Sequence, residues 1–121
     1  MSYSRGVGET KSTDLEYLTV PDLVALWGIT PTKVHRLLED HVLAAVRVDG
    51  VLRIPAEFVK DDEPLHPLRG TLLALLDAGF TEEEAVAWLL ADNDELGERP
   101  VTALRAGRKS AVRRATQALA F

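Results

Sequence analysis

The sequence contains no cysteine among its 121 residues. This absence excludes a disulfide-stabilised scaffold, an iron–sulfur cluster, a thiolate zinc site and a cysteine nucleophile. The chain also lacks any apolar run near the ~18 residues that a membrane span requires, and its first eight residues lack the apolar stretch of a signal peptide. We therefore expect a soluble, cytoplasmic protein that has no contact with membranes.

An excess of positive charge is missing as well, because 14 Lys and Arg residues stand against 19 Asp and Glu residues. The charges are nevertheless strongly segregated: residues 61–98 carry one base and eleven acids, whereas residues 99–121 carry six bases and no acid. This basic end is open to two interpretations, an internal partner for the acidic segment or a second contact for phosphate groups. Its candidate residues are Arg105, Arg108, Lys109, Arg113 and Arg114.

Residues 1–17 show no apolar periodicity and are rich in Gly, Ser, Thr and charged side chains. A segment of this composition has too little apolar surface to bury, so we predict a disordered tail. The whole chain is 46% hydrophobic, which is near the average of globular proteins at about 45–50%. A folded core is therefore expected after residue 17.

Two short helices are predicted close together in the first half of the chain. Thr19 is placed as an N-cap with Pro21 in the first turn, and Gly28 supplies a left-handed stop. Thr30 and Pro31 then form a second N-cap followed by proline at the first helical position. The second helix therefore begins two residues after the first ends, as in a helix-turn-helix.

The second predicted helix, residues 31–41, has one apolar stripe. Its members follow an i, i+3, i+4, i+7 spacing and are Val34, Leu37, Leu38 and His41. Thr32, Lys33 and Arg36 consequently face away from the core. In a helix-turn-helix the second helix enters the major groove of DNA, so these polar and basic side chains form a candidate DNA-contacting surface.

The segment from Ala44 to Ile54 alternates about Asp49–Gly50, which predicts a β-hairpin. A two-residue loop at Asp49–Gly50 would mix charged and apolar side chains on both faces. A three-residue loop over residues 48–50 instead pairs Val46 with Leu52, and we expect this register.

In the expected register Ile54 lies on the buried face, while Arg47, Val51 and Arg53 turn outward. A hairpin with two outward arginines directly after a helix-turn-helix is a wing, which lies along the phosphate backbone beside the groove. Pro55 ends the second strand, and residues 56–59 are expected to add a helical turn.

Residues 18–56, which contain LTVPDLVALWGITPTKVHRLL and then AVRVDGVLRIPA, resemble the winged helix-turn-helix of excisionase-type and MerR-type DNA-binding proteins in the order and spacing of their motifs. With the rest of the chain, the sequence is similar to a small actinobacterial family of winged helix-turn-helix DNA-binding proteins that includes a substrate of a membrane Ser/Thr protein kinase. The resemblance implies double-stranded DNA as a partner. It places the recognition-helix contacts at Thr30, Thr32, Lys33, His35 and Arg36, and the wing contacts at Arg47 and Arg53.

The same resemblance implies that a Ser/Thr protein kinase phosphorylates a threonine of the tail, either Thr10 or Thr13. A phosphate adds about −1.5 to −2 charges. Because this tail has only two basic residues, we expect its modification to weaken DNA binding.

The second half of the chain is predicted to be helical after a linker over residues 61–64. Helices are expected from Pro67 to Gly79, from a capping box formed by Thr81 and Glu84, over residues 100–106, and around Val112. The fold class is therefore mainly α with a small β-hairpin, in which a winged helix-turn-helix at residues 18–60 precedes a C-terminal helical bundle at residues 61–121.

Residues 88–119 also resemble the C-terminal domain of Xre-type antitoxins, which bind toxin partners. The matching elements are Trp88–Leu89, Asn93, Leu96–Gly97, Pro100, Leu104, Gly107 and Val112. Each has a structural use as a turn, a cap or a core contact, so we interpret the likeness as a shared fold. It leaves an alternative function open, a module for self-association or for a protein partner in which DNA binding is secondary.

Residues suited to catalysis are sparse. His35 and Glu39 lie one helical turn apart, but no third metal ligand is placed beside them. The acidic runs at residues 61–63 and 82–84 are explained by a solvated linker and by a helix N-terminus. We therefore expect no enzyme, no metal and no cofactor, and a transcriptional regulator located with the nucleoid is the expected function.

Overall fold

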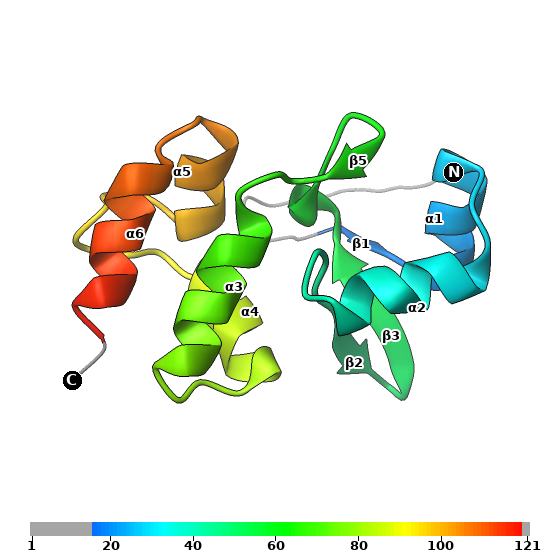
Figure 1. Cartoon of the computed structure of the whole chain (residues 1–121), viewed down its shortest axis with the longest axis horizontal. Coiled ribbons are helices and arrows are strands. Elements are labelled where there is room, and N and C mark those ends of the chain that lie inside the picture. The colour runs from blue at the N-terminus through cyan, green and yellow to red at the C-terminus, as the bar shows by residue number, and fades with distance from the viewer. Residues whose placement is uncertain (1–15, 120–121) are drawn as a thin grey trace.

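The computed structural model describes residues 16–119 (Figure 1). Thr10 and Thr13, the expected phosphorylation sites, lie outside these residues. The helices are α1 (Val20–Trp27), α2 (Pro31–Glu39), the 3₁₀-helix η1 (Ala56–Phe58), α3 (Leu68–Asp77), α4 (Glu82–Leu90), α5 (Pro100–Arg105) and α6 (Lys109–Gln117). The strands are β1 (Tyr17–Leu18), β2 (Val46–Val48), β3 (Val51–Pro55), β4 (Val59–Lys60) and β5 (Glu63–Pro64). The chain is thus mainly helical with small antiparallel sheets, as expected from the sequence.

The starts of α1 and α2 are fixed by the predicted caps. The Thr19 hydroxyl accepts a hydrogen bond from the Asp22 N–H, and the Asp22 carboxylate accepts one from the Thr19 N–H at 2.9 Å. Gly28 closes α1 at φ +65°, and the Thr30 hydroxyl oxygen then accepts the Lys33 N–H at 3.1 Å. These local hydrogen bonds satisfy backbone groups that each helix terminus leaves free.

α2 is shorter than expected, because it ends at Glu39 and does not reach His41. His41 has φ +61°, its N–H donates to Leu38 O, and the next N–H, that of Val42, donates to Leu37 O. This pair of hydrogen bonds is the Schellman arrangement, in which a left-handed residue ends the helix. The prediction that His41 continues the apolar stripe of this helix is therefore wrong.

The wing has a different register from the expected one. β2 and β3 pair Val46 with Arg53, Arg47 with Leu52 and Val48 with Val51, so the loop has two residues. Asp49 and Gly50 both have positive φ, at 55° and 81°. This is the signature of a type I′ turn, whose twist matches that of the two strands.

The register changes the positions of the two wing arginines. Residues directly opposite each other in an antiparallel pair share a face, so Arg47 lies on the face of Leu52 and Ile54, and Arg53 lies on the face of Val46. The expectation that both arginines turn outward together is therefore wrong. Ile54 is buried, as expected.

One short strand pairing and a neighbouring hydrogen bond extend the sheet beyond the hairpin. β1 pairs with β3, which matches Tyr17 with Pro55 and Leu18 with Ile54 and gives a three-stranded sheet of order β1-β3-β2. The Ala56 N–H also donates to Glu16 O at 2.9 Å. Tyr17, which the sequence assigned to the tail, therefore belongs to β1, and Glu16 is hydrogen-bonded to the first residue of η1.

The run over residues 61–64 is not a simple linker. β4 and β5 pair in antiparallel fashion, with Asp61 and Asp62 at the turn between them. Asp61 adopts φ +58°, which aspartate tolerates better than most residues. The acidic side chains therefore lie at an exposed hairpin turn, where they remain solvated.

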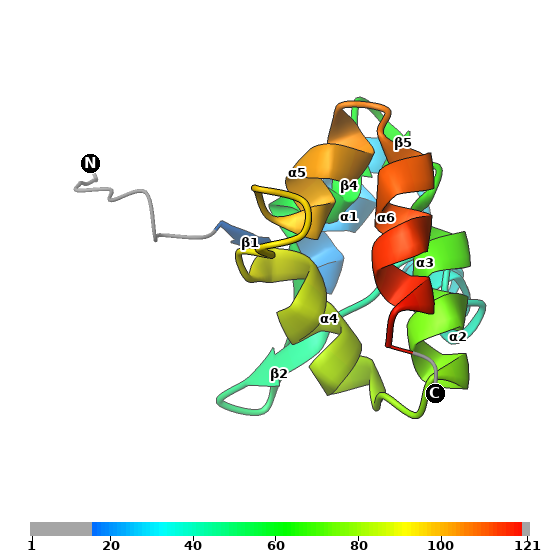
Figure 2. The same ribbon diagram turned by 90° about the vertical axis from the view of Figure 1, so that its left-hand side faces the viewer.

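The N-terminal segment (residues 16–60) and the C-terminal segment (residues 61–119) share one hydrophobic core. The N-terminal segment contributes buried side chains such as Leu23, Ile54 and Phe58, and the C-terminal segment contributes others such as Leu75 and Leu104. In Figures 1 and 2, α3 lies between α2 and α6, and α4 lies beside α3. The start of α4 is fixed by the predicted capping box of Thr81 and Glu84.

Arginines of the C-terminal segment hold the junction between the two segments. Arg99 forms a bidentate ion pair with Glu57 at 2.8 and 2.5 Å. These hydrogen bonds raise the pKa of the Arg99 guanidinium above its ordinary value, against the smaller opposing effect of burial. Arg105 donates to the backbone oxygens of Glu57 and Val59 at 2.9 and 2.7 Å. Within the basic end, Arg108 pairs with Glu98 of the acidic segment, whereas Arg99 and Arg105 bind groups of the N-terminal segment.

Replacing Arg105 with methionine is expected to lower the free energy of unfolding by about 1–3 kcal/mol, because two partly buried carbonyl oxygens lose a charged donor. Arg108→Met is the matched control: it removes an exposed ion pair, which contributes about 0–1 kcal/mol. Urea denaturation followed by circular dichroism measures both. Equal losses in the two variants would contradict a specific role for Arg105 at the junction.

Candidate nucleic-acid interface

The residues predicted to contact DNA from α2 lie together on its outer surface. Thr32, Lys33, His35 and Arg36 are exposed, whereas Val34 is fully buried. Thr30 is exposed too, but its hydroxyl oxygen already accepts the Lys33 N–H, so it has a structural role in the N-cap. In residues 16–119 no ion pair engages Lys33 or Arg36. Both cations are therefore available to an anionic partner.

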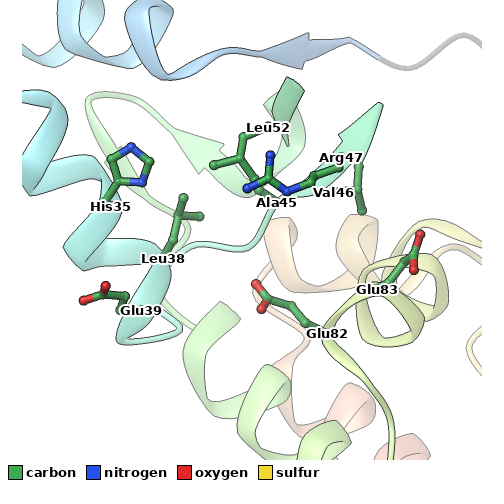
Figure 3. A pocket seen from close by; sticks show the side chains of 9 residues that line it. All are labelled: His35, Leu38, Glu39, Ala45, Val46, Arg47, Leu52, Glu82 and Glu83. Carbon is green, nitrogen blue, oxygen red and sulfur yellow. The ribbon is translucent and has the colours of Figure 1, made fainter. Parts of the chain in front are cut away.

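Arg47 extends this surface onto the wing. Its Nη1 donates to Gly50 O at 3.2 Å, across the turn of the hairpin. Arg47 and Leu52 from the wing, together with His35 and Leu38 from α2, line an open groove of about 470 Å³ (Figure 3). We call this space the α2–wing groove. The structure thus brings Arg47 beside the helix that carries Lys33 and Arg36.

Arg53 is placed differently from the other predicted site residues. It is half-buried on the opposite face of the wing and does not line the α2–wing groove. Its Nε is buried and has no hydrogen-bond partner within the described part of the chain. The structure therefore brings together the α2 residues and Arg47, but not Arg53.

Three carboxylates also line the α2–wing groove: those of Glu39, Glu82 and Glu83. From the sequence, the two α4 residues were expected only to form part of a helix N-terminus. Their run of acidic residues is visible in the sequence, but no sequence signal indicates that α4 begins beside the wing. The packing of α4 into the core, against α3 and α5, brings them to this surface.

Membrane-spanning helices and metal sites, which are typical of other functional classes, can be judged for residues 16–119. No helix there combines the length and apolar character needed to cross a membrane. Within the same range, no group of three or more His, Cys, Asp or Glu side chains is arranged to hold a metal ion. His35 and Glu39 thus form no group of three with another residue of this range.

Comparisons with known proteins give the same family for both segments. Residues 11–59 match the model described as DNA-binding protein Rv2175c, wHTH domain, and residues 65–120 match the one described as Rv2175c C-terminal domain of unknown function. The chain is 30% identical over 115 residues to the DNA-binding protein Rv2175c of Mycobacterium tuberculosis, covering 84% of this chain and 79% of that protein. An excisionase of Streptomyces ambofaciens is 37% identical over 46 residues, covering 38% of this chain and 74% of the excisionase.

The fold also matches a solved structure. The NMR structure of Rv2175c superposes with a TM-score of 0.80 at 28% sequence identity, covering 94% of this chain and 87% of that one. These findings confirm the family and the fold class that the sequence predicts. The chain belongs to the family of the DNA-binding protein Rv2175c, with a winged helix-turn-helix domain followed by the C-terminal domain of that family.

Proposed function

We propose that this protein binds double-stranded DNA as a regulator of transcription, with α2 in the major groove and the wing on the phosphate backbone. One observation carries the proposal: Lys33 and Arg36 are exposed on α2 without ion pairs in the described residues, and Arg47 lies beside that helix across the α2–wing groove. The winged helix-turn-helix family of the chain supports the same function.

The residues of the interface have different roles in this proposal. Arg36 and Lys33 contact base edges, because arginine and lysine donate to the N7 and O6 acceptors of guanine in the major groove. Arg47 binds a backbone phosphate, which fixes the position of the duplex without selecting its sequence. Thr32 and His35 add polar contacts on the same helix surface. Arg53 has a lesser role, because it lies on the other face of the wing.

Arg47→Ala is expected to reduce the dependence of DNA binding on salt. Each phosphate contact contributes about 0.9 to the slope of log K against log salt concentration, so losing one contact flattens the slope by about that amount. Fluorescence anisotropy with a duplex selected from a random library gives this slope. The titrations cover roughly 50 to 200 mM salt, where the electrostatic effect on affinity is large.

Arg53→Ala is the matched control for that experiment, because it removes the same charge from the opposite face of the wing. Its slope is expected to stay closer to that of the unmodified protein. The assignment of Arg47 to the backbone contact would be contradicted if Arg47→Ala leaves the slope unchanged. It would also be contradicted if the slope becomes flatter by the same amount in both variants. Thermal melting of both variants checks that they are folded.

Several finer expectations stay predictions. A chromosomal DNA partner would place the protein with the nucleoid in the cytoplasm. Phosphorylation of Thr10 or Thr13 by a Ser/Thr protein kinase stays a prediction from the resemblance, as does the alternative of a protein-interaction module in the C-terminal segment. A purified protein that binds no duplex at low salt would refute the main proposal and leave that alternative.

A further inference from the structure

The C-terminal segment forms one wall of the α2–wing groove. Glu82 and Glu83 of α4 line the groove together with His35 and Arg47. Figure 3 shows Glu82 and Arg47 on different sides of the groove, with the Glu82 carboxylate pointing into it. Residues that the sequence separates by more than thirty positions are thus gathered at the surface proposed to meet DNA.

The capping box at the start of α4 uses only one of the three acidic side chains in the first turn. The Glu84 carboxylate accepts the Thr81 N–H at 2.9 Å, and the Thr81 hydroxyl accepts the Glu84 N–H at 3.1 Å. Glu84 is therefore engaged in the capping box. Glu82 and Glu83 precede it in the first turn, and in residues 16–119 no hydrogen bond or ion pair engages their side chains.

The groove therefore carries more negative than positive charge. Its lining includes three carboxylates, on Glu39, Glu82 and Glu83, but only one arginine, Arg47. Glu39 belongs to α2 itself, whereas the other two carboxylates come from the C-terminal segment. Charges at an exposed surface act over a Debye length of about 8 Å at physiological salt, so a phosphate that binds Arg47 lies within the field of these carboxylates.

We propose that the first turn of α4 is part of the DNA interface and forms its negatively charged border. Glu82 and Glu83 repel backbone phosphates, which weakens binding to every duplex and confines the DNA strand to the Arg47 side of the groove. This inference rests on the proposed function of the α2–wing surface. It gives the C-terminal segment a direct role in setting DNA affinity, in addition to its packing against the wing domain.

The test is the double variant Glu82→Gln/Glu83→Gln, which keeps the side-chain size and leaves the Thr81–Glu84 capping box unchanged. Removal of the two negative charges from the groove is expected to tighten binding roughly 3- to 10-fold at low salt, and the gain is expected to shrink as salt screens the charges. Fluorescence anisotropy of the full chain with selected and random duplexes at two salt concentrations measures the effect.

The matched control is Asp94→Asn/Glu95→Gln, which makes the same change in net charge on exposed residues of the loop after α4, outside the groove. We expect this control to change affinity less than twofold. The proposal would be overturned if the DNA affinity of Glu82→Gln/Glu83→Gln equals that of the unmodified protein or that of the control. If the double variant melts below the assay temperature, Glu82→Gln alone is measured against Asp94→Asn with the same criterion.

The outcomes also separate this proposal from the one on which it rests. An unmodified protein that binds no duplex at low salt would refute DNA binding itself, and the acidic border would fall with it. The other outcome is that the unmodified protein binds DNA through Arg47, but Glu82→Gln/Glu83→Gln gives no specific gain in affinity. This outcome would refute the acidic border alone.

Discussion

Phe58→Ala is expected to lower the free energy of unfolding by about 3–5 kcal/mol, the usual cost of truncating a fully buried phenylalanine. Phe58 has no exposed surface and belongs to η1, which packs against α5. The cavity left by the ring would lie in the core shared by the two segments. Because small domains have a free energy of unfolding of only about 5–15 kcal/mol, this loss is a large share of the total.

The two tryptophans allow both segments to be followed in the same experiment. Trp27 ends α1 and Trp88 lies in α4, so the single-tryptophan variants Trp27→Phe and Trp88→Phe each report on one segment. Urea denaturation of Phe58→Ala in either background is expected to show the same, lowered midpoint. Leu26→Ala, at a side chain that is 51% exposed, is the control and is expected to change stability by less than about 0.5 kcal/mol.

Two separate transitions would contradict a single shared core. A lowered midpoint at Trp27 with an unchanged midpoint at Trp88 would show that the C-terminal helices unfold independently of the wing domain. The structure predicts coincident transitions, because buried side chains from both segments form one cluster.

Arg36→Ala is expected to weaken binding to a selected duplex by about 5- to 150-fold, which corresponds to about 1–3 kcal/mol for the loss of a bidentate contact to a base. Binding to random-sequence DNA is expected to fall much less, because that binding depends on phosphate contacts. Arg36 is exposed on α2 beside Lys33, and in residues 16–119 it forms no ion pair whose loss would destabilise the fold.

Arg114→Ala is the matched control for Arg36→Ala, because it removes an exposed arginine from another helix, α6, with the same change in charge. Anisotropy titrations with the selected and random duplexes give the ratio of the two affinities for each variant. A ratio that Arg36→Ala leaves unchanged would refute base contact by this residue. A ratio that falls equally in Arg114→Ala would assign the effect to overall charge.

The sequence by itself determined the starts of α1, α2 and α4, the end of α1 and the outer surface of α2. The caps act through hydrogen bonds or backbone conformations within a few residues, so they can be predicted from the local sequence. They are Thr19, Gly28 and Thr30. The same holds for the capping box at Thr81. Exposure of Lys33 and Arg36 follows from the periodicity of the apolar stripe on the same helix.

The wing register was decided by the turn and the strands together. Both arginines were expected on the solvent face, because charged side chains are usually exposed. In the structure Arg53 is half-buried opposite Val46, which its long aliphatic stem allows. The type I′ turn at Asp49–Gly50 sets the pairing of the strands, and the side chains adapt to it.

Only the tertiary structure decided which segments meet at the candidate site. β1 has just two residues and exists because β3 offers it hydrogen-bonding partners from a distant part of the chain. The α2–wing groove likewise joins His35, Arg47 and Glu82, which no local pattern connects. Packing α3 and α4 against one shared core places an acidic helix start beside a basic wing, because burial of apolar side chains, and not the charges themselves, sets the positions of the helices.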